Sequence, residues 1–101
     1  MAQTIAVDLD KTLAKYTTFK KEIGKPVPLM LERVQKWIDK GKEVIIFSAR
    51  AKNAVERKKI SRWLLKYGLP QLEVTNVKQP KMEEFWDDRA VAVVPNTGEI
   101  A

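Results

Sequence analysis

Two uninterrupted apolar runs constrain the fold of this 101-residue chain most strongly. Residues 4–10 read TIAVDLD and residues 42–49 read KEVIIFSA, and both runs are rich in Val and Ile. Strands that are covered on both faces have this pattern, and they lie centrally in parallel sheets. Between the runs, Pro28 can open a helix that Gly41 ends. This segment carries three apolar side chains on one face: Leu31, Val34 and Ile38. The pattern predicts a β-α-β unit.

The second half of the chain predicts one more helix and several short strands. The helix begins near Asn53 or Ala54 and ends at Gly68, which Pro70 follows. Its inward side chains are expected to be Ile60, Trp63, Leu64 and Tyr67. The expected strands cover residues 72–74, 83–88 and 90–94. Alternating strands and helices predict an α/β fold with an open, mainly parallel sheet of about five strands, in a single domain over residues 1–101.

The residue inventory excludes several kinds of site. The chain has no cysteine and no histidine, so it can form neither disulfides nor Cys/His zinc sites nor His-based triads. Its formal charge of +6 favours anionic partners such as phosphate esters or nucleic acid. Because no secretory signal and no long apolar run is visible, we expect a soluble cytoplasmic protein without membrane contact.

Two acidic pairs follow predicted strands. Asp8 and Asp10 end the first apolar run, and Asp87 and Asp88 follow the strand expected at 83–88. Open parallel sheets bind ligands beyond the carboxyl ends of their strands. Aspartates also cap helices and start turns, so either pair alone has a purely structural interpretation. Together, the two pairs indicate a site for a hard divalent cation such as Mg²⁺.

Four motifs in order resemble those of the haloacid dehalogenase superfamily of phosphotransferases. They are VDLDKTL, VIIFSAR with its Ser48, a following lysine, and FWDDRA, and the resemblance covers residues 3–94. It implies a Rossmann-like core and hydrolysis of phosphomonoesters. In such enzymes Asp8 would be the nucleophile that forms an aspartyl phosphate, and Asp10 would be the general acid and base. Thr12 would support the loop, and Ser48 would bind a phosphoryl oxygen.

The same resemblance implies a magnesium site. Asp8, Asp87 and the main-chain carbonyl of Asp10 would bind Mg²⁺, and Asp88 would orient the ion through water or through its other ligands without touching it. Together with the motif lysine, the ion would neutralise the transferring phosphoryl group.

The basic residues near the motifs leave alternatives open. The motif lysine is Lys78 or Lys81, and we favour Lys78 because it follows the apolar segment LEVTNV. Lys11 stands where the family usually has glycine, and it either assists phosphate binding or points into water. Arg50 and Arg89 follow their motifs directly, so either can reach an anionic substrate. For Arg89 a surface ion pair is the favoured interpretation.

The intervals between the motifs are too short for the cap domain that many members carry. The chain therefore resembles small capless hydrolases of bacteria and phages. Capless members act on large substrates, or a neighbouring subunit covers their site. The helix after Asn53 is similar to a region of bacteriophage polynucleotide kinases, which suggests a nucleotide or nucleic-acid 3′-phosphate as substrate. Residues 14–28, with Tyr16 and Phe19, are expected to form a flap beside the first strand.

Two other functions compete with the phosphatase. A non-catalytic basic module on the same fold would bind nucleic acid, lose affinity steeply with salt and ignore EDTA. A phosphotransfer receiver also has a phosphorylated aspartate, but its acidic pair lies in an earlier strand than that aspartate. The order of motifs here disfavours a receiver.

Overall fold

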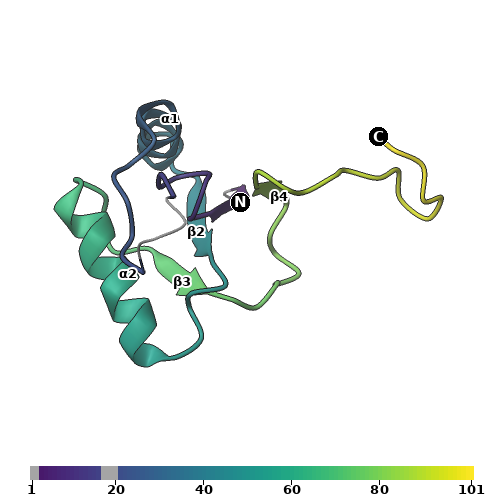
Figure 1. The fold of residues 1–101 in the computed structure, drawn as a ribbon. Helices are drawn as coiled ribbons and strands as arrows, with labels where there is room; N and C mark the ends of the chain where they lie inside the picture. Colours follow the sequence, from purple (N-terminus) through teal and green to yellow (C-terminus); the bar gives the residue numbers. More distant parts are fainter. Residues whose placement is uncertain (1–2, 17–20) are drawn as a thin grey trace.

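A four-stranded parallel sheet organises the molecule, as the computed structural model shows (Figure 1). The structure describes residues 3–16 and 21–101, so residues 17–20 of the expected flap, including Phe19, lie outside it. The strands are β1 (Thr4–Asp8), β2 (Glu43–Phe47), β3 (Glu73–Thr75) and β4 (Glu84–Trp86), in the order β3-β2-β1-β4. The predicted α/β class and the two central strands are confirmed.

The two helices form where the sequence predicts them. Helix α1 (Pro28–Asp39) begins with its proline in the first turn, and α2 (Ala54–Lys66) is capped by Asn53, whose side chain accepts a hydrogen bond from the N–H of Glu56 at 2.9 Å. Gly68, which follows the C-cap residue Tyr67 of α2, has φ +82°, a conformation that glycine adopts without steric cost.

Both helices lie on one face of the sheet (Figure 1). The β1-α1-β2 and β2-α2-β3 connections step in the same direction along the sheet, and right-handed crossovers then place their helices on the same side. The main core lies between these layers, where α1 and α2 bury Val34, Ile60 and Leu64 against β1 and β2. Trp63 belongs to the same core.

The opposite face of the sheet has only a thin cover. Residues 76–83 cross it from β3 to β4 without forming a helix. Met82 is the buried side chain of this segment, and it packs with Ala6 and Ile45. The sheet is therefore well covered on one face only.

The expected strand at residues 90–94 does not form, so the sheet has four strands and not about five. These residues leave the end of β4 and project away from the body (Figure 1), and all of them are exposed. The alternation of Ala and Val is compatible with a strand, but the chain turns away before it can pair with β4. Among the described helices, none is long and apolar enough to cross a membrane.

Candidate active site

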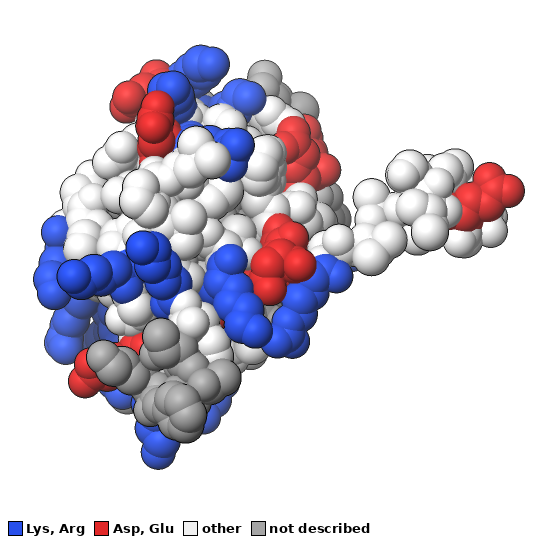
Figure 2. Space-filling model, turned by 45° about the horizontal axis from the view of Figure 1, so that its top comes forward, with Lys and Arg blue, Asp and Glu red and all other residues white. Residues whose placement is uncertain are grey.

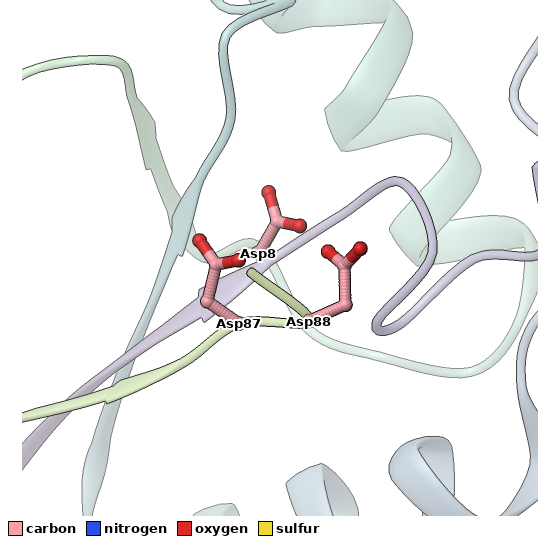
Figure 3. A group of neighbouring side chains, drawn as sticks. All are labelled: Asp8, Asp87 and Asp88. Carbon is pink, nitrogen blue, oxygen red and sulfur yellow. The ribbon is translucent and has the colours of Figure 1, made fainter. Parts of the chain in front are cut away.

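Strand register brings the two acidic motifs together at the carboxyl edge of the sheet. Val7 of β1 is paired with Trp86 of β4, so the residues that follow, Asp8 and Asp87, are neighbours. Asp8, Asp87 and Asp88 each offer one carboxylate oxygen, and these three oxygens all lie within 4.8 Å of one another. Figure 3 shows the three side chains projecting to the same side of the strand ends. We call these residues the carboxylate cluster.

The carboxylate cluster is electrostatically strained. Burial, and then the charge of Asp87, raise the pKa of the half-buried Asp8 carboxyl to about 7, with Asp88 contributing in the same direction. Within residues 3–16 and 21–101, no lysine or arginine forms an ion pair with these three aspartates. Each carboxylate therefore faces like charge without a described lysine or arginine in direct ion-pair contact.

A small divalent cation fits this donor set. An octahedral Mg²⁺ ion about 2.1 Å from its ligands holds two oxygens about 3.0 Å apart in cis positions and about 4.2 Å apart in trans positions. The three oxygens, which lie within 4.8 Å of one another, would therefore need to approach by no more than about 2 Å. Carboxylate oxygens are the ligands that Mg²⁺ prefers, and a cation would relieve the repulsion that raises the pKa of Asp8.

Thr12 ties the two acidic loops together. Its Oγ1 accepts a hydrogen bond from the backbone N–H of Asp88 at 3.1 Å. The same oxygen lies 3.3 Å from Asp8 Oδ2 and 3.4 Å from Asp88 Oδ1, so its single proton has two carboxylate acceptors. The supporting role expected for Thr12 agrees with these contacts.

Asp10 points to a different neighbour. Strand β1 ends at Asp8, and the carboxylate of Asp10 lies outside the carboxylate cluster. Its Oδ2 accepts a hydrogen bond of 2.6 Å from Arg50 Nε, and this contact raises the pKa of the Arg50 guanidinium against the effect of burial. Arg50 also donates to the carbonyl of Lys21. The guanidinium thus holds Asp10. Contact of Arg50 with an anionic substrate stays a prediction.

The other oxygen of Asp10 needs a partner. Asp10 Oδ1 is buried, and in the described part of the chain it has no hydrogen-bond partner. Buried polar atoms are almost always satisfied, and an unsatisfied one calls for an explanation such as a ligand or a catalytic role.

Ser48 stands at the end of β2, beside Asp10. Only 2% of its surface is exposed, and its Oγ accepts a hydrogen bond from the N–H of Arg50 at 3.1 Å. Its own N–H donates to the carbonyl of Thr75 at 2.9 Å, which fixes the end of β2 to β3. Ser48 lines an open cavity of about 390 Å³ together with the four motif aspartates. The structure therefore brings both acidic motifs and Ser48 to one cavity.

Neither candidate motif lysine lines this cavity. Lys81 pairs with Glu43 and Glu73, which start β2 and β3, so it lies at the opposite edge of the sheet. Lys78 follows the correct end of β3, but its Nζ lies 5.1 Å from the ring centroid of Phe85. Sequence distance alone could not distinguish these two locations, and the role of Lys78 in phosphate binding stays a prediction.

Lys11 and Arg89 are the basic residues that do line the cavity. No ion pair of Arg89 is formed within the described ranges, against the surface pairing expected for it. Lys11 has φ +71°, a left-handed conformation that favours glycine, the residue that the resemblance leads us to expect at this position. Figure 2 shows acidic side chains at the base of the projecting segment with basic side chains on either side.

Two aromatic residues of the cavity were missed as site residues by sequence reasoning. Tyr16 and Phe47 line it, and Lys11 Nζ lies 5.5 Å from the centroid of the Tyr16 ring. The signal for Phe47 was its place next to Ser48 at the end of a strand. For Tyr16 it was the aromatic residue in a Lys-rich segment after the first motif.

Comparison with known proteins gives one informative likeness. No family model matches the sequence, and no curated protein matches it. A solved structure described as "conserved protein coded by locus from Bacteroides thetaiotaomicron" is similar, with a TM-score of 0.71 and 25% sequence identity over 95% of this chain and 84% of that chain. That description names no activity. The likeness supports a shared fold over almost the whole chain.

Proposed function

We propose that this protein is a magnesium-dependent phosphomonoesterase of the haloacid dehalogenase type. The carboxylate cluster carries the proposal, because it joins residues from both acidic motifs in one cavity that Asp10 and Ser48 also line. The pairing of β1 with β4 makes these aspartates neighbours, and like charges held this close favour a bound cation over a purely structural role. The order of the four motifs supports the same conclusion.

In the first step, Asp8 would attack the phosphorus of a bound phosphate monoester. A bond forms between one Asp8 carboxylate oxygen and phosphorus, and the bond from phosphorus to the leaving oxygen breaks. Asp10 would give a proton to that leaving oxygen. Its Oδ1 has no other described partner, so it is free to carry this proton.

In the second step, water would hydrolyse the aspartyl phosphate. Asp10 takes a proton from the water, the water oxygen bonds to phosphorus, and the bond from Asp8 to phosphorus breaks. Inorganic phosphate leaves, and both aspartates return to their starting states. Arg50 would act by holding Asp10 in place through both steps.

Mg²⁺ would be held by Asp8, Asp87 and the main-chain carbonyl of Asp10, with Asp88 bound directly or through water, and it would offset the charge of the phosphoryl group. Lys11 and Arg89 are the cavity cations best placed to add to this effect. Lys78 would have to leave the ring of Phe85 to do the same.

The substrate we favour is a nucleotide or a nucleic-acid 3′-phosphate. The charge of +6 attracts polyanions, and Tyr16 and Phe47 provide aromatic surface beside the phosphoryl site. Among residues 3–16 and 21–101, no cap domain closes over the cavity, which leaves room for a large substrate.

Phosphate release tests this function. The purified protein is incubated with para-nitrophenyl phosphate and with oligonucleotides phosphorylated at the 3′ or the 5′ end, each with Mg²⁺ or EDTA. We expect Mg²⁺-dependent release that Asp8→Asn abolishes and that Glu43→Gln, at the opposite edge of the sheet, leaves unchanged. Release that persists in Asp8→Asn would contradict the nucleophile assignment.

A basic nucleic-acid-binding module is the second candidate. Helix α2 supports it, because it carries exposed basic side chains on its outer face: Lys58, Lys59, Arg62 and Lys66. A binder of this kind would release no phosphate, and its affinity for oligonucleotides would fall steeply with salt whether or not EDTA is present.

A further inference from the structure

The last part of the chain forms an arm that the body does not hold. We define the arm as residues 90–101, which project away from the sheet after β4 (Figure 1). In the described structure no hydrogen bond or ion pair links residues 91–101 to the body, and no side chain of the arm joins either hydrophobic cluster. The arm is therefore held in place by its covalent connection alone.

The arm is nevertheless folded on itself. The N–H of Val94 donates to the carbonyl of Glu99 at 2.7 Å, and the N–H of Ala101 donates to the carbonyl of Ala92 at 2.9 Å. These bonds flank an antiparallel bridge between Val93 and Ile100. The arm is a small preformed hairpin, and a preformed element loses little conformational entropy when it binds.

Its surface is unusually apolar for a chain of this kind. Four of the ten large hydrophobic side chains that the described structure exposes belong to these twelve residues: Val91, Val93, Val94 and Ile100. Val91 is 69% exposed and Ile100 is 78% exposed. Residues 90–98 include no charged residue, although 32% of the whole chain is charged. An uncharged, exposed apolar hairpin is typical of an element that packs against a protein surface.

The body has an exposed apolar surface at an edge strand against which such a hairpin can pack. Strand β4 is at the edge of the sheet, so none of the described strands pairs with its outer backbone groups. Phe85 of β4 is 37% exposed, and it lies on the face that no helix covers, in edge-to-face contact with Phe47. Val77, in the crossover segment on this face, is also exposed.

We propose that the arm packs against β4 and Phe85 of a second copy of this chain, in a reciprocal dimer. One chain supplies both the unsupported arm and the open edge, so a twofold exchange satisfies both surfaces with a single kind of contact. Each copy carries a charge of +6, and two such bodies repel. The uncharged arm is the part that can reach a second copy without bringing the basic surfaces together.

Sedimentation of the full chain tests the dimer. We expect the wild-type protein to sediment at twice the mass of one chain at micromolar concentration. Val93→Lys places a charge in the contact and should give a monomer. Because Val93 is exposed and belongs to neither hydrophobic cluster of the body, the variant should keep the circular dichroism spectrum of the wild-type protein.

A matched control and a cross-link locate the contact. Val55→Lys adds the same charge at an exposed valine of α2 and should leave the dimer intact. The chain has no native cysteine, so Val93→Cys and Phe85→Cys can be mixed and joined with a short thiol cross-linker. The mixture should give a covalent heterodimer, and a mixture of Val55→Cys with Phe85→Cys should not.

Three results would overturn the proposal. They are a wild-type protein that stays monomeric, a dimer that survives Val93→Lys, and a dimer that Val55→Lys weakens as strongly as Val93→Lys does. The first would leave the arm to a different partner, and the others would place the contact elsewhere. None of them bears on the phosphatase, which is tested by phosphate release.

Discussion

Carboxylates gather at both ends of the strands, at the amino edge and at the carboxyl edge of the sheet. They are paired with a lysine at the amino edge and lie next to one another at the carboxyl edge. At the amino edge, Lys81 lies 3.3 Å from a Glu43 carboxylate oxygen and 3.6 Å from one of Glu73. A hydrogen bond from Thr4, and then the contact with Lys81, lower the pKa of Glu43. At the carboxyl edge, burial and neighbouring carboxylates raise the pKa of Asp8 to about 7.

The difference separates a surface whose charges are paired with one another from a surface whose charges are arranged for a ligand. Exposed ion pairs such as that of Lys81 contribute little to the free energy of unfolding, and their charges are already balanced without a ligand. The carboxylate cluster has no such cation among the described side chains, and a fold retains this kind of strain where another group relieves it. Variants that change charges or side-chain contacts at one edge, each compared with a control elsewhere in the chain, test this interpretation.

The largest expected effect is on catalysis at the carboxyl edge. Asp8→Asn should lower Mg²⁺-dependent phosphatase activity by roughly a factor of 1000 or more, because it removes the nucleophile but keeps the shape. Glu73→Gln, the matched loss of one charge at the amino edge, should change kcat by less than about a factor of two. Equal losses in the two variants would mean that neither edge is the active site.

A smaller effect is expected from the residue that holds the general acid. Arg50→Lys keeps the charge but loses the fixed guanidinium contact with Asp10, so kcat should fall by roughly a factor of 10 to 100. Alkyl phosphates should suffer more than para-nitrophenyl phosphate, whose leaving group needs less protonation. Arg62→Lys, on the exposed face of α2, is the control. Uniform losses over both substrates would indicate a structural role only.

The next smaller effect is on the pH dependence of the free energy of unfolding, which should depend on Asp8 at the carboxyl edge. In the native metal-free protein Asp8 keeps a proton between about pH 4 and 7, whereas the unfolded chain has lost it. The free energy of unfolding should therefore fall as pH rises through this range, by roughly 1–2 kcal/mol for a half-buried group. Asp8→Asn should flatten this slope, and Mg²⁺ should remove it at neutral pH. Urea melts at several pH values measure the effect, and a slope that Asp8→Asn leaves unchanged would contradict it.

The smallest expected effect concerns the loop beside the carboxylate cluster. Lys11→Gly relieves a left-handed conformation but gives the unfolded chain more freedom, so stability should change by less than about 1 kcal/mol in either direction. Phosphatase activity should fall if the Lys11 ammonium assists phosphate binding. Lys78→Ala is the comparison, and a larger loss of phosphatase activity in Lys78→Ala than in Lys11→Gly would support Lys78 as the motif lysine.

Local patterns predicted most of the fold. The runs at β1 and β2, the proline of α1 and the Asn53 cap each specify their element through nearby residues. The prediction of a strand over residues 90–94 was wrong. The Ala and Val residues there favour a strand conformation, but they do not determine whether the chain turns back to pair with the sheet. That outcome depends on the direction of the chain after Asp88.

The acidic residues and Ser48 of the site were predictable, but its aromatic residues and its pairings were not. Both acidic motifs stand at the ends of predicted parallel strands, so their place at one edge of the sheet was foreseeable. That β1 and β4 are direct neighbours is seen in the structure. The contact of Arg50 with Asp10 joins residues 40 positions apart, and it depends on how the loop after Asp8 turns at Lys11. The separation of Lys78 from Lys81 depends on a crossover without regular structure, which no periodic pattern describes.

Calorimetric titration of Mg²⁺ tests the central claim most directly. We expect one Mg²⁺ ion to bind to the wild-type protein and to Glu43→Gln with the same affinity, and binding to Asp87→Asn to be weaker by roughly a factor of 10 or more. Binding that is unchanged in Asp87→Asn, or no binding to the wild-type protein, would contradict the assignment of the carboxylate cluster as a metal centre.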